Sequence, residues 1–263
     1  MKTKQVIDHI VHWLDDYLEK SGLNGFTIGI SGGIDSAVTS TLVAKTGRPT
    51  LVLEIPIHQE SEQVSRAQEH IGFLKAYFSQ VDALRVDLSP VFDVFFQCVQ
   101  VADKQDPKTA LALANMRSRL RMSTLYYYAG LYDYLVTGTG NKVEDFGVGF
   151  FTKYGDGGVD LSPIADLTKS QVRHLAKTLG ISALIRQANP TDGLWEDNRS
   201  DEDQLGASYK DLEWAMEMAE QNRPPDAFDG GHRELIEKYL KLHRAAQHKI
   251  RPIPVCKIPS SLK

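Results

Sequence analysis

The stretch FTIGISGGIDSAVTSTLVAKTG, residues 26–47, determines most of what can be expected of the fold. Its first five residues are apolar apart from Thr27 and Gly29, as in a buried strand. Two glycines then interrupt the strand, and an apolar helical pattern runs on to Gly47, a residue that suits the end of a helix. A buried strand that passes through a glycine turn into a helix is the start of a βαβ unit.

The alternation of strand and helix continues outward from this stretch. Further strands are predicted at 50–55, 84–88 and 133–138, and helices at 5–19, 61–78, from Ser89-Pro90 onward, 107–131, 168–180, 202–221 and 231–247. Such alternation predicts an α/β fold with a doubly wound, mostly parallel sheet and helices on both faces. Ligands of these folds bind at the carboxyl ends of the strands, where residues 139–167 form a long glycine- and aspartate-rich connection.

Composition excludes several classes of protein. The chain has 263 residues, 42% hydrophobic and 24% charged, and is interpreted as a single folded domain over 1–263. It has no apolar run of the roughly 20 residues that span a bilayer, so we expect a cytoplasmic protein without a membrane partner. A net charge of −4 argues against a nucleic-acid partner. The two cysteines, Cys98 and Cys256, are too far apart for the usual zinc spacing.

The turn SGGIDS, residues 31–36, predicts an anion site. Backbone amides of the turn and the positive end of the following helix point to one place, and Ser31 and Ser36 can add hydroxyl donors. It is not a Walker loop, because the GxxxxGK[ST] pattern is absent. An ordinary strand-to-helix turn with a serine cap is the alternative interpretation.

SGGIDS after a strand resembles the pyrophosphate loop of the ATP pyrophosphatase family, whose members split ATP into AMP and pyrophosphate. The resemblance implies a Rossmann-like fold of the adenine nucleotide alpha hydrolase type and ATP as a co-substrate. It also implies that Asp35 is catalytic and binds Mg²⁺. The loop residues expected to bind ATP are Gly29, Ile30, Ser31, Gly32, Gly33, Ile34, Asp35 and Ser36.

Four further segments resemble the NAD synthetase family within this group, in the same order and at about the same spacing. They are NMRSRLRM at 115, GTGNKVE at 138, GFFTKYGDGGVDLSPIADLTKSQV at 149, and NPTDGLW with SDEDQLG at 189–206. The resemblance implies that ATP adenylates the carboxylate of nicotinate adenine dinucleotide (deamido-NAD) and that ammonia then displaces AMP to give NAD. It also implies a homodimer with helix 107–131 at the interface.

Some of these positions have a physical rationale of their own. Asn115 and Arg119 are four residues apart on one helix face, so together they could bind one carboxylate or phosphate. Arg117 and Arg121 lie on another side of the helix. For these two arginines, a solvated or ion-paired position on the helix surface is an equally good interpretation. Lys169 stands in the first turn of a helix, where a cation opposes the macrodipole unless an anion lies nearby.

The resemblance assigns a role to each of the remaining candidates. Asp156 and Lys169 are expected to be catalytic, with Asp156 as the group that takes a proton from ammonium. Thr139, Lys169 and Thr191 are expected to contact ATP. The expected deamido-NAD contacts are Asn115, Arg119, Lys153, Asp160, His248 and Lys249.

One departure from the family pattern concerns the second Mg²⁺ ligand. Glu144 is the expected carboxylate, but it precedes Lys153 by one position more than the family spacing. Asp145 could therefore hold the metal instead, and Glu144 is the favoured choice.

Three alternatives bear on the function. A tRNA-modifying ATP pyrophosphatase would need paired cysteines or a basic RNA surface, and a catalytically silent nucleotide-binding module would not need Asp35, Glu144, Lys169 and Asp156 together. Glutamine-using relatives carry an extra amidase domain, and the synthetase resemblance alone accounts for this chain. Free ammonia is therefore the expected nitrogen donor, although a separate amidase chain could supply it.

Overall fold

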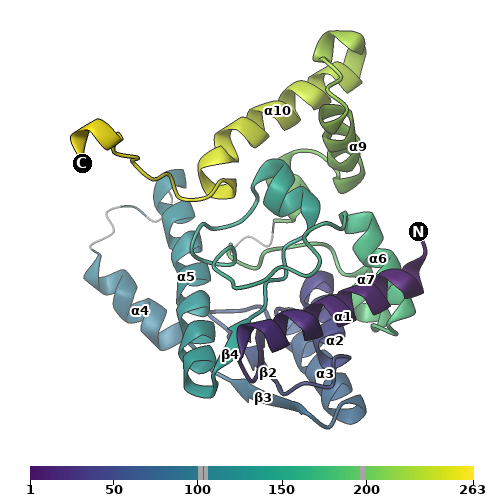
Figure 1. The fold of residues 1–263 in the computed structure, drawn as a ribbon, viewed down its shortest axis with the longest axis vertical. Helices are drawn as coiled ribbons and strands as arrows, with labels where there is room; N and C mark the ends of the chain where they lie inside the picture. Colours follow the sequence, from purple (N-terminus) through teal and green to yellow (C-terminus); the bar gives the residue numbers. More distant parts are fainter. Residues whose placement is uncertain (100–102, 104–105, 196–198) are drawn as a thin grey trace.

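The computed structural model describes residues 1–99, 103, 106–195 and 199–263. Four parallel strands form one sheet in the order β3-β2-β1-β4 (Figure 1). The strands are β1 (Gly25–Gly29), β2 (Thr50–Glu54), β3 (Val81–Arg85) and β4 (Tyr134–Val136). The helices are α1 (Thr3–Ser21), α2 (Ile34–Ala44), α3 (Ser61–Tyr77), α4 (Ser89–Cys98), α5 (Pro107–Tyr132), α6 (Lys169–Thr178), α7 (Ala183–Gln187), α8 (Asp201–Leu205), α9 (Tyr209–Glu220) and α10 (Gly230–Ile250), with a π-helical turn η1 (Val143–Val148) and 3₁₀ turns η2 (Pro225–Ala227) and η3 (Ser260–Leu262).

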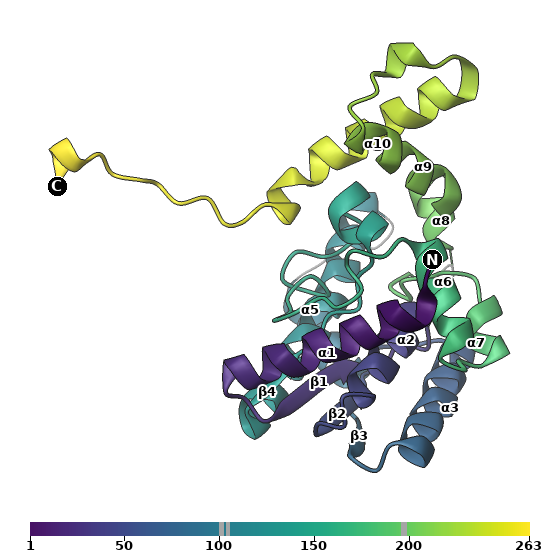
Figure 2. The same cartoon turned by 45° about the vertical axis from the view of Figure 1, so that its right-hand side comes forward.

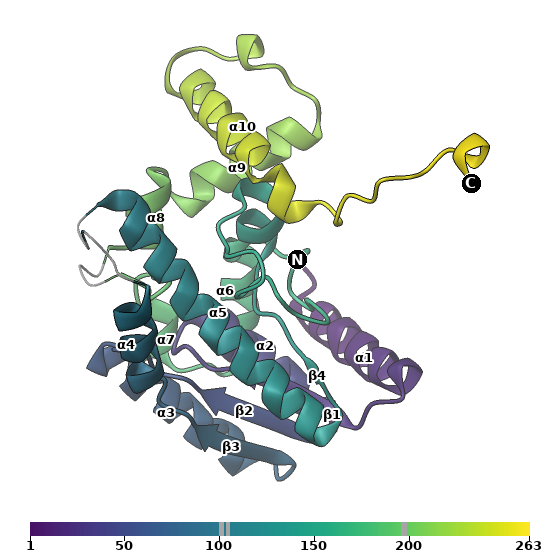
Figure 3. The same ribbon diagram turned by 90° about the vertical axis from the view of Figure 1, so that its left-hand side faces the viewer.

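Helices cover both faces of the sheet, as the alternating pattern predicted. Figure 3 shows α5 crossing one face, with α2 and α3 on the other. The larger apolar cluster joins α1, α2, α6 and α7 to Phe26 and Leu135, and a smaller one places Leu125 of α5 against Leu51 and Leu53 of β2. The predicted α/β class is therefore confirmed.

The third strand lies earlier in the chain than predicted. The sequence favoured 84–88, whereas β3 is Val81–Arg85 and pairs Val81 with Thr50. This edge strand is largely exposed, so its polar residues hide the apolar pattern that marks a buried strand. The register comes from pairing with β2, which local sequence does not report.

The carboxyl-terminal third also differs in detail. The single helix predicted over 202–221 is two helices, because Gly206 adopts a left-handed conformation with φ of 64° and Ser208 caps α9. Helix α7 was not predicted. Part of the irregular segment 189–202, residues 196–198, lies outside the described residues.

Helices α9 and α10 form a second layer beyond the carboxyl ends of the strands. Figure 2 shows this pair on one side of the sheet and the last residues extending away from the molecule. Leu212 and Met216 of α9 pack with Ile236 of α10 and Val143 of η1. This packing brings α9 over the loop that follows β4.

Candidate active site

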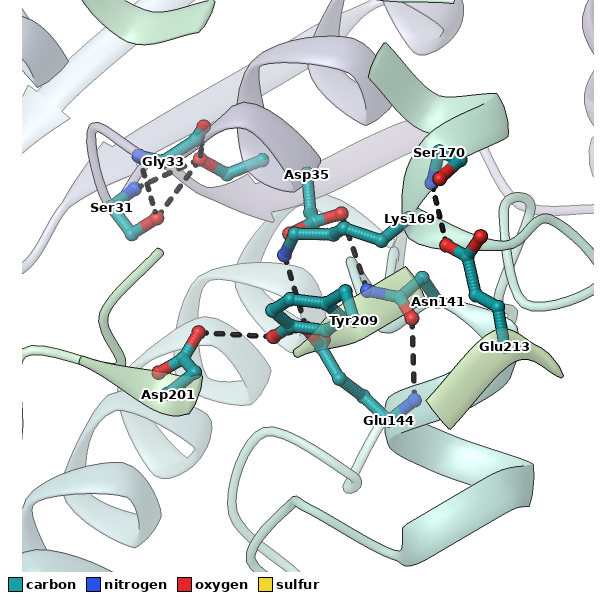
Figure 4. Close-up of polar contacts among 11 residues, drawn as sticks. Ser31, Gly33, Asp35, Asn141, Glu144, Lys169, Ser170, Asp201, Tyr209 and Glu213 are labelled. Atoms are coloured by element: carbon teal, nitrogen blue, oxygen red, sulfur yellow. Dashed lines mark hydrogen bonds and ion pairs between the residues drawn. The ribbon is translucent and has the colours of Figure 1, made fainter. Parts of the chain in front are cut away.

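The glycine turn between β1 and α2 lies at the carboxyl edge of the sheet (Figure 4). Gly33 is the N-cap of α2, and within the described residues no side chain caps this helix. The Oγ atom of Ser31 accepts a hydrogen bond from the Gly33 amide at 3.2 Å and lies 3.0 Å from Ser36 Oγ. The alternative of an ordinary serine-capped helix is therefore wrong. The uncapped end of α2 is suited to an anion.

Gly32 is required by the packing of this turn. Its φ is +79°, and a Cβ atom there would lie 2.4 Å from the carbonyl oxygen of Gln63 in α3. Only glycine combines that backbone conformation with so close a contact. The turn is thus held against α3 by its backbone.

A buried lysine lies beside the turn and joins two carboxylates. Lys169 Nζ is 2.5 Å from Asp35 Oδ2 and 3.0 Å from Glu144 Oε1, and only 3% of the residue is exposed. Burial alone would lower the pKa of Lys169, but its attraction to Asp35 and Glu144 outweighs burial and raises that pKa. These carboxylates are the anions that offset a cation in the first turn of α6.

The same two carboxylates fit a magnesium site. Their oxygens already converge on one positive charge, and carboxylate oxygen is the donor that Mg²⁺ prefers. Across the described part of the chain, no group of three histidine, cysteine or acidic side chains could hold a metal ion. Water and substrate phosphate oxygens would therefore complete the coordination.

Glu144 and Asp145 occupy different surroundings in η1. The Glu144 carboxylate meets Lys169, and its amide donates to Asn141 Oδ1 at 3.2 Å. Asp145 instead packs against Gly140, where an added Cβ would lie 2.0 Å from its Oδ2 atom. Burial raises the pKa of Asp145 well above its ordinary value. Glu144 is therefore the carboxylate that faces Asp35.

Asn141 was not anticipated as a site residue. Its side chain is fully buried, and Nδ2 donates to Asp35 Oδ1 at 3.4 Å while Oδ1 accepts from the Glu144 amide. It therefore links the Asp35 carboxylate to the backbone of Glu144. The sequence did offer a signal for Asn141 as a site residue, namely its place in the family-like segment GTGNKVE.

Tyr209 and Asp201 also belong to this cluster (Figure 4). The Tyr209 hydroxyl contacts both Glu144 Oε1 and Asp201 Oδ2, the latter at 3.1 Å. The capping of α8 is done by Ser200, which leaves the buried Asp201 side chain free for this contact. Burial and repulsion from Glu144 raise the pKa of Asp201 to about 7. Tyr209 had no sequence signal of its own, because it lies inside the helix predicted over 202–221.

Asp156 lies where the long loop meets α5. Its Oδ1 atom accepts hydrogen bonds from Ser118 Oγ at 2.6 Å and from the Thr152 amide at 2.9 Å. Desolvation raises the pKa of Asp156, although both hydrogen bonds lower it. A carboxyl group with a raised pKa is a better proton acceptor than an ordinary aspartate.

Asn115 and Arg119 both contact the long loop from one face of α5. Asn115 Oδ1 accepts from Thr152 Oγ1 at 2.6 Å, and the Arg119 guanidinium donates to the Lys153 carbonyl at 3.4 Å. Asn115 lines the cavity described below, whereas Arg119 is exposed beside it. The shared helix face predicted for these residues is confirmed.

The end of α10 closes onto the same loop. Lys153 Nζ donates to the His248 carbonyl at 2.6 Å, and Lys249 Nζ donates to the Phe151 carbonyl at 2.7 Å. Lys249 reaches the cavity, while His248 is exposed. Segments nearly 100 residues apart are joined here.

Thr139, Thr191 and Asp160 lie in different places. Thr139 follows β4 and lines the cavity. Thr191 also lines the cavity, and its Oγ1 atom accepts a hydrogen bond from the Gly193 amide at 3.2 Å. Asp160 does not line it. Its carboxylate accepts from the Val136 amide at 2.7 Å and from Tyr126 Oη at 2.9 Å.

Arg117 and Arg121 are not solvated helix surface. Arg117 is buried and donates to the Leu194 carbonyl at 3.0 Å. Arg121 lines the cavity and donates to the Ile55 carbonyl at 3.0 Å and to Gln59 Oε1 at 2.7 Å. Both therefore belong to the interior of the α5 face.

These groups surround a cavity of about 450 Å³ at the carboxyl ends of the strands. Its wall is formed in part by the glycine turn, the Asp35–Glu144–Lys169 cluster and Asp156. A glycine turn at the start of a helix, beside carboxylates in a large cavity of a parallel sheet, defines an α/β nucleotide-binding enzyme of the pyrophosphate-loop class.

Comparison with known proteins narrows this class. The model of the NAD synthase family matches residues 6–253, so the chain belongs to that family. It is 38% identical over 258 residues to the NH3-dependent NAD+ synthetase of Alkaliphilus oremlandii, covering 96% of both chains. It is 36% identical over 245 residues to the NH3-dependent NAD+ synthetase of Carboxydothermus hydrogenoformans, covering 93% of both.

A solved structure supports the same placement. The NMN synthetase of Francisella tularensis has a TM-score of 0.84 and 31% identity, with 98% of this chain and 100% of that chain covered. The family model and the two synthetases above confirm the expected family. In the part of the chain that the structure describes, none of the helices combines the length and the apolar character needed to cross a membrane.

Proposed function

We propose that this cavity carries out the ATP-dependent amidation of deamido-NAD to NAD with ammonia. The convergence of Asp35, Glu144 and Lys169 beside the glycine turn is the observation that carries this conclusion. ATP is the co-substrate, and the enzyme is a ligase that forms a carbon–nitrogen bond. The substrate carboxylate attacks the α-phosphorus of ATP, which gives an adenylated carboxylate and releases pyrophosphate. Ammonia then attacks the acyl carbon, and AMP leaves.

The turn 29–36 binds the departing pyrophosphate. Backbone amides at the start of α2 and the Ser31 and Ser36 hydroxyls supply donors to it. Asp35 and Glu144 would hold Mg²⁺, which when bound offsets the negative charge that develops on the phosphates. Lys169 neutralises the same region from α6, and Thr139 and Thr191 contact ATP from the cavity wall.

The deamido-NAD molecule lies along the loop, α5 and the end of α10. The residues proposed to hold it are Asn115, Arg119, Lys153, Asp160, His248 and Lys249. Asn115 and Lys249 reach the cavity directly, and Lys153 and His248 are joined by a hydrogen bond beside it. Arg119 supports the loop backbone at Lys153.

Asp156 prepares the nucleophile. Ammonium binds to its carboxylate and gives it a proton, because only neutral ammonia carries the lone pair that attacks the acyl carbon. The raised pKa of Asp156 favours that transfer. Free ammonia is the proposed nitrogen donor.

We also propose a homodimer formed through α5. Its exposed apolar side chains support this, since Leu111, Tyr127 and Leu131 are 51%, 65% and 57% exposed. Light scattering of the purified protein measures the assembly.

A cytoplasmic location is supported by the free, exposed thiols of Cys98 and Cys256, which suit a reducing compartment.

Product analysis tests the proposed reaction. The protein is supplied with ATP, Mg²⁺ and deamido-NAD, with ammonium, glutamine or no nitrogen donor, and NAD and AMP are followed by chromatography. We expect NAD and AMP with ammonium and little NAD with glutamine. Nicotinate mononucleotide replaces deamido-NAD in a parallel arm, because the similar Francisella protein is an NMN synthetase.

An Asp35→Asn variant provides the matched control. It keeps the size of the side chain but removes the charge that faces Lys169, so AMP formation should stop. Folded wild-type protein that forms neither AMP nor an amide with any substrate would contradict the proposed function. Faster turnover of the mononucleotide would move the assignment to that substrate.

A further inference from the structure

Tyr209 connects the Glu144 carboxylate to a third acidic side chain. Its hydroxyl contacts Glu144 Oε1 and lies 3.1 Å from Asp201 Oδ2 (Figure 4). Tyr209 is 3% exposed, and Lys169 Nζ lies 4.7 Å from the centroid of its ring. Tyr209 therefore touches both the proposed metal ligand and the cation between the two ligands.

A second contact from the same helix fixes the backbone beside Lys169. Glu213 Oε1 accepts a hydrogen bond from the Ser170 amide at 2.8 Å. Tyr209 and Glu213 are four residues apart on α9 and share one face. Tyr209 on this face contacts Glu144, and Glu213 binds the start of α6, which carries Lys169. Helix α9 therefore fixes the position of Glu144 relative to Lys169.

Asp201 fixes Tyr209 from the opposite side. It is 5% exposed, and its Oδ1 atom has no hydrogen-bond partner among the described residues. Its amide donates to the Pro190 carbonyl at 3.0 Å, which ties it to the loop that carries Thr191. A buried oxygen without a partner costs free energy, so packing alone does not account for an aspartate at this position.

Packing does not require the Tyr209 hydroxyl either. The ring lies in the apolar cluster of α9, α10 and η1, where phenylalanine would fill the same space. A buried hydroxyl is costly unless it forms hydrogen bonds, and the partners of this one are the two carboxylates. Packing in the apolar core therefore does not explain the hydroxyl, whereas its contacts with the two carboxylates do.

We propose that Tyr209, held by Asp201, is a positioning residue that fixes the Glu144 carboxylate for Mg²⁺ binding. This inference rests on the proposed function, because it concerns the metal that accompanies ATP. Groups that orient a metal ligand contribute to metal affinity, and their loss costs about 10- to 100-fold.

A Tyr209→Phe variant tests this role, with Tyr239→Phe as the matched control. Tyr239 is equally buried in the same apolar cluster but lies on α10, and within the described residues no hydrogen bond joins it to Glu144. Mn²⁺ replaces Mg²⁺ as the probe, together with α,β-methylene-ATP, which cannot be cleaved between the α and β phosphates. Free Mn²⁺ is measured by electron paramagnetic resonance.

We expect Tyr209→Phe to weaken Mn²⁺ binding by about 10- to 100-fold and Tyr239→Phe to leave it unchanged. Asp201→Asn should also weaken it, and the double variant should lose little more than Tyr209→Phe, because both act through one chain of contacts. Equal Mn²⁺ affinity of wild type and Tyr209→Phe would overturn the proposal. So would fully additive losses in the double variant.

The assay also separates this proposal from the proposed function. Mn²⁺ binding with the analogue requires no turnover, so it can succeed even if no NAD is formed. If Tyr209→Phe does not fold, as judged by circular dichroism, Asp201→Asn alone decides the proposal by the same Mn²⁺ measurement. Wild-type affinity of Asp201→Asn would then overturn it.

Discussion

Lys169 and Arg121 are cations on the wall of the same cavity, yet their surroundings are opposite. Lys169 lies between two carboxylates, which raise its pKa above the ordinary value. Arg121 donates hydrogen bonds to a carbonyl and an amide oxygen, and burial together with repulsion from Arg117 lowers its pKa to about 10. Across the described residues no carboxylate forms an ion pair with Arg121.

The difference indicates two kinds of task. The Lys169 charge is already balanced, so its loss would expose two acidic groups to each other. Asp156 and Asp192 attract the Arg121 guanidinium, but among the described residues neither forms an ion pair with it. Lys169 thus holds the site together, whereas we expect Arg121 to contribute to the binding of an anionic substrate.

The largest effect should come from Lys169→Met. Asp35 and Glu144 would lose their buried partner, so the free energy of unfolding at neutral pH should fall by about 3–5 kcal/mol, and AMP formation should stop. Urea titration and product analysis measure the two effects. Lys177→Met, at an exposed position of the same helix, is the control. A Lys169→Met protein as stable as this control would break the comparison.

His70 sharpens the comparison as a buried base that forms no ion pair with any residue that the structure describes. Its Nε2 atom lies 2.9 Å from Ser40 Oγ, and burial lowers its pKa from 6.5 to about 4. Between these values the unfolded chain binds the extra proton, so this residue makes the protein less stable as the pH falls from 6.5 to 4. The full effect is about 3 kcal/mol.

His70→Gln should therefore lose less stability than wild type over that pH interval. Glutamine keeps a hydrogen-bonding group for Ser40 but does not titrate. The free energy of unfolding is measured by urea titration at several pH values, with the exposed His12→Gln as control. Parallel pH profiles of wild type and His70→Gln would show that the buried ring does not resist protonation.

The smallest effect is expected for Arg121→Met. Methionine removes no ion pair but leaves the Ile55 carbonyl and Gln59 Oε1 without this donor, so the free energy of unfolding should fall by only about 1–2 kcal/mol. The KM of ATP or of deamido-NAD should rise by about 10-fold, or about 1.4 kcal/mol, with a smaller change in kcat. Steady-state kinetics with each substrate varied measure this. Unchanged KM values for both would remove the distinction between the two cations.

Local signals predicted most of the fold and part of the site. The start of α6 was correctly predicted because it depends on local sequence: its capping box joins Thr168 to Gln171, only three residues further on. The edge strand β3 was displaced because its position depends on pairing with β2. Tyr209 escaped notice because a tyrosine on an amphipathic helix is ordinarily a core residue, and its distinguishing contacts come from Glu144 and Asp201.

By itself the sequence determined the βαβ unit, the glycine turn and the oddity of a lysine in the first turn of α6, because these depend on neighbours within a few residues. Tertiary structure decided what that lysine meets. Asp35 lies 134 residues from Lys169 in the chain, and Glu144 reaches it from a π-helical turn that no periodic pattern announces. Such contacts arise only when the sheet brings the ends of β1 and β4 together, so the charge balance of the site is a property of the fold.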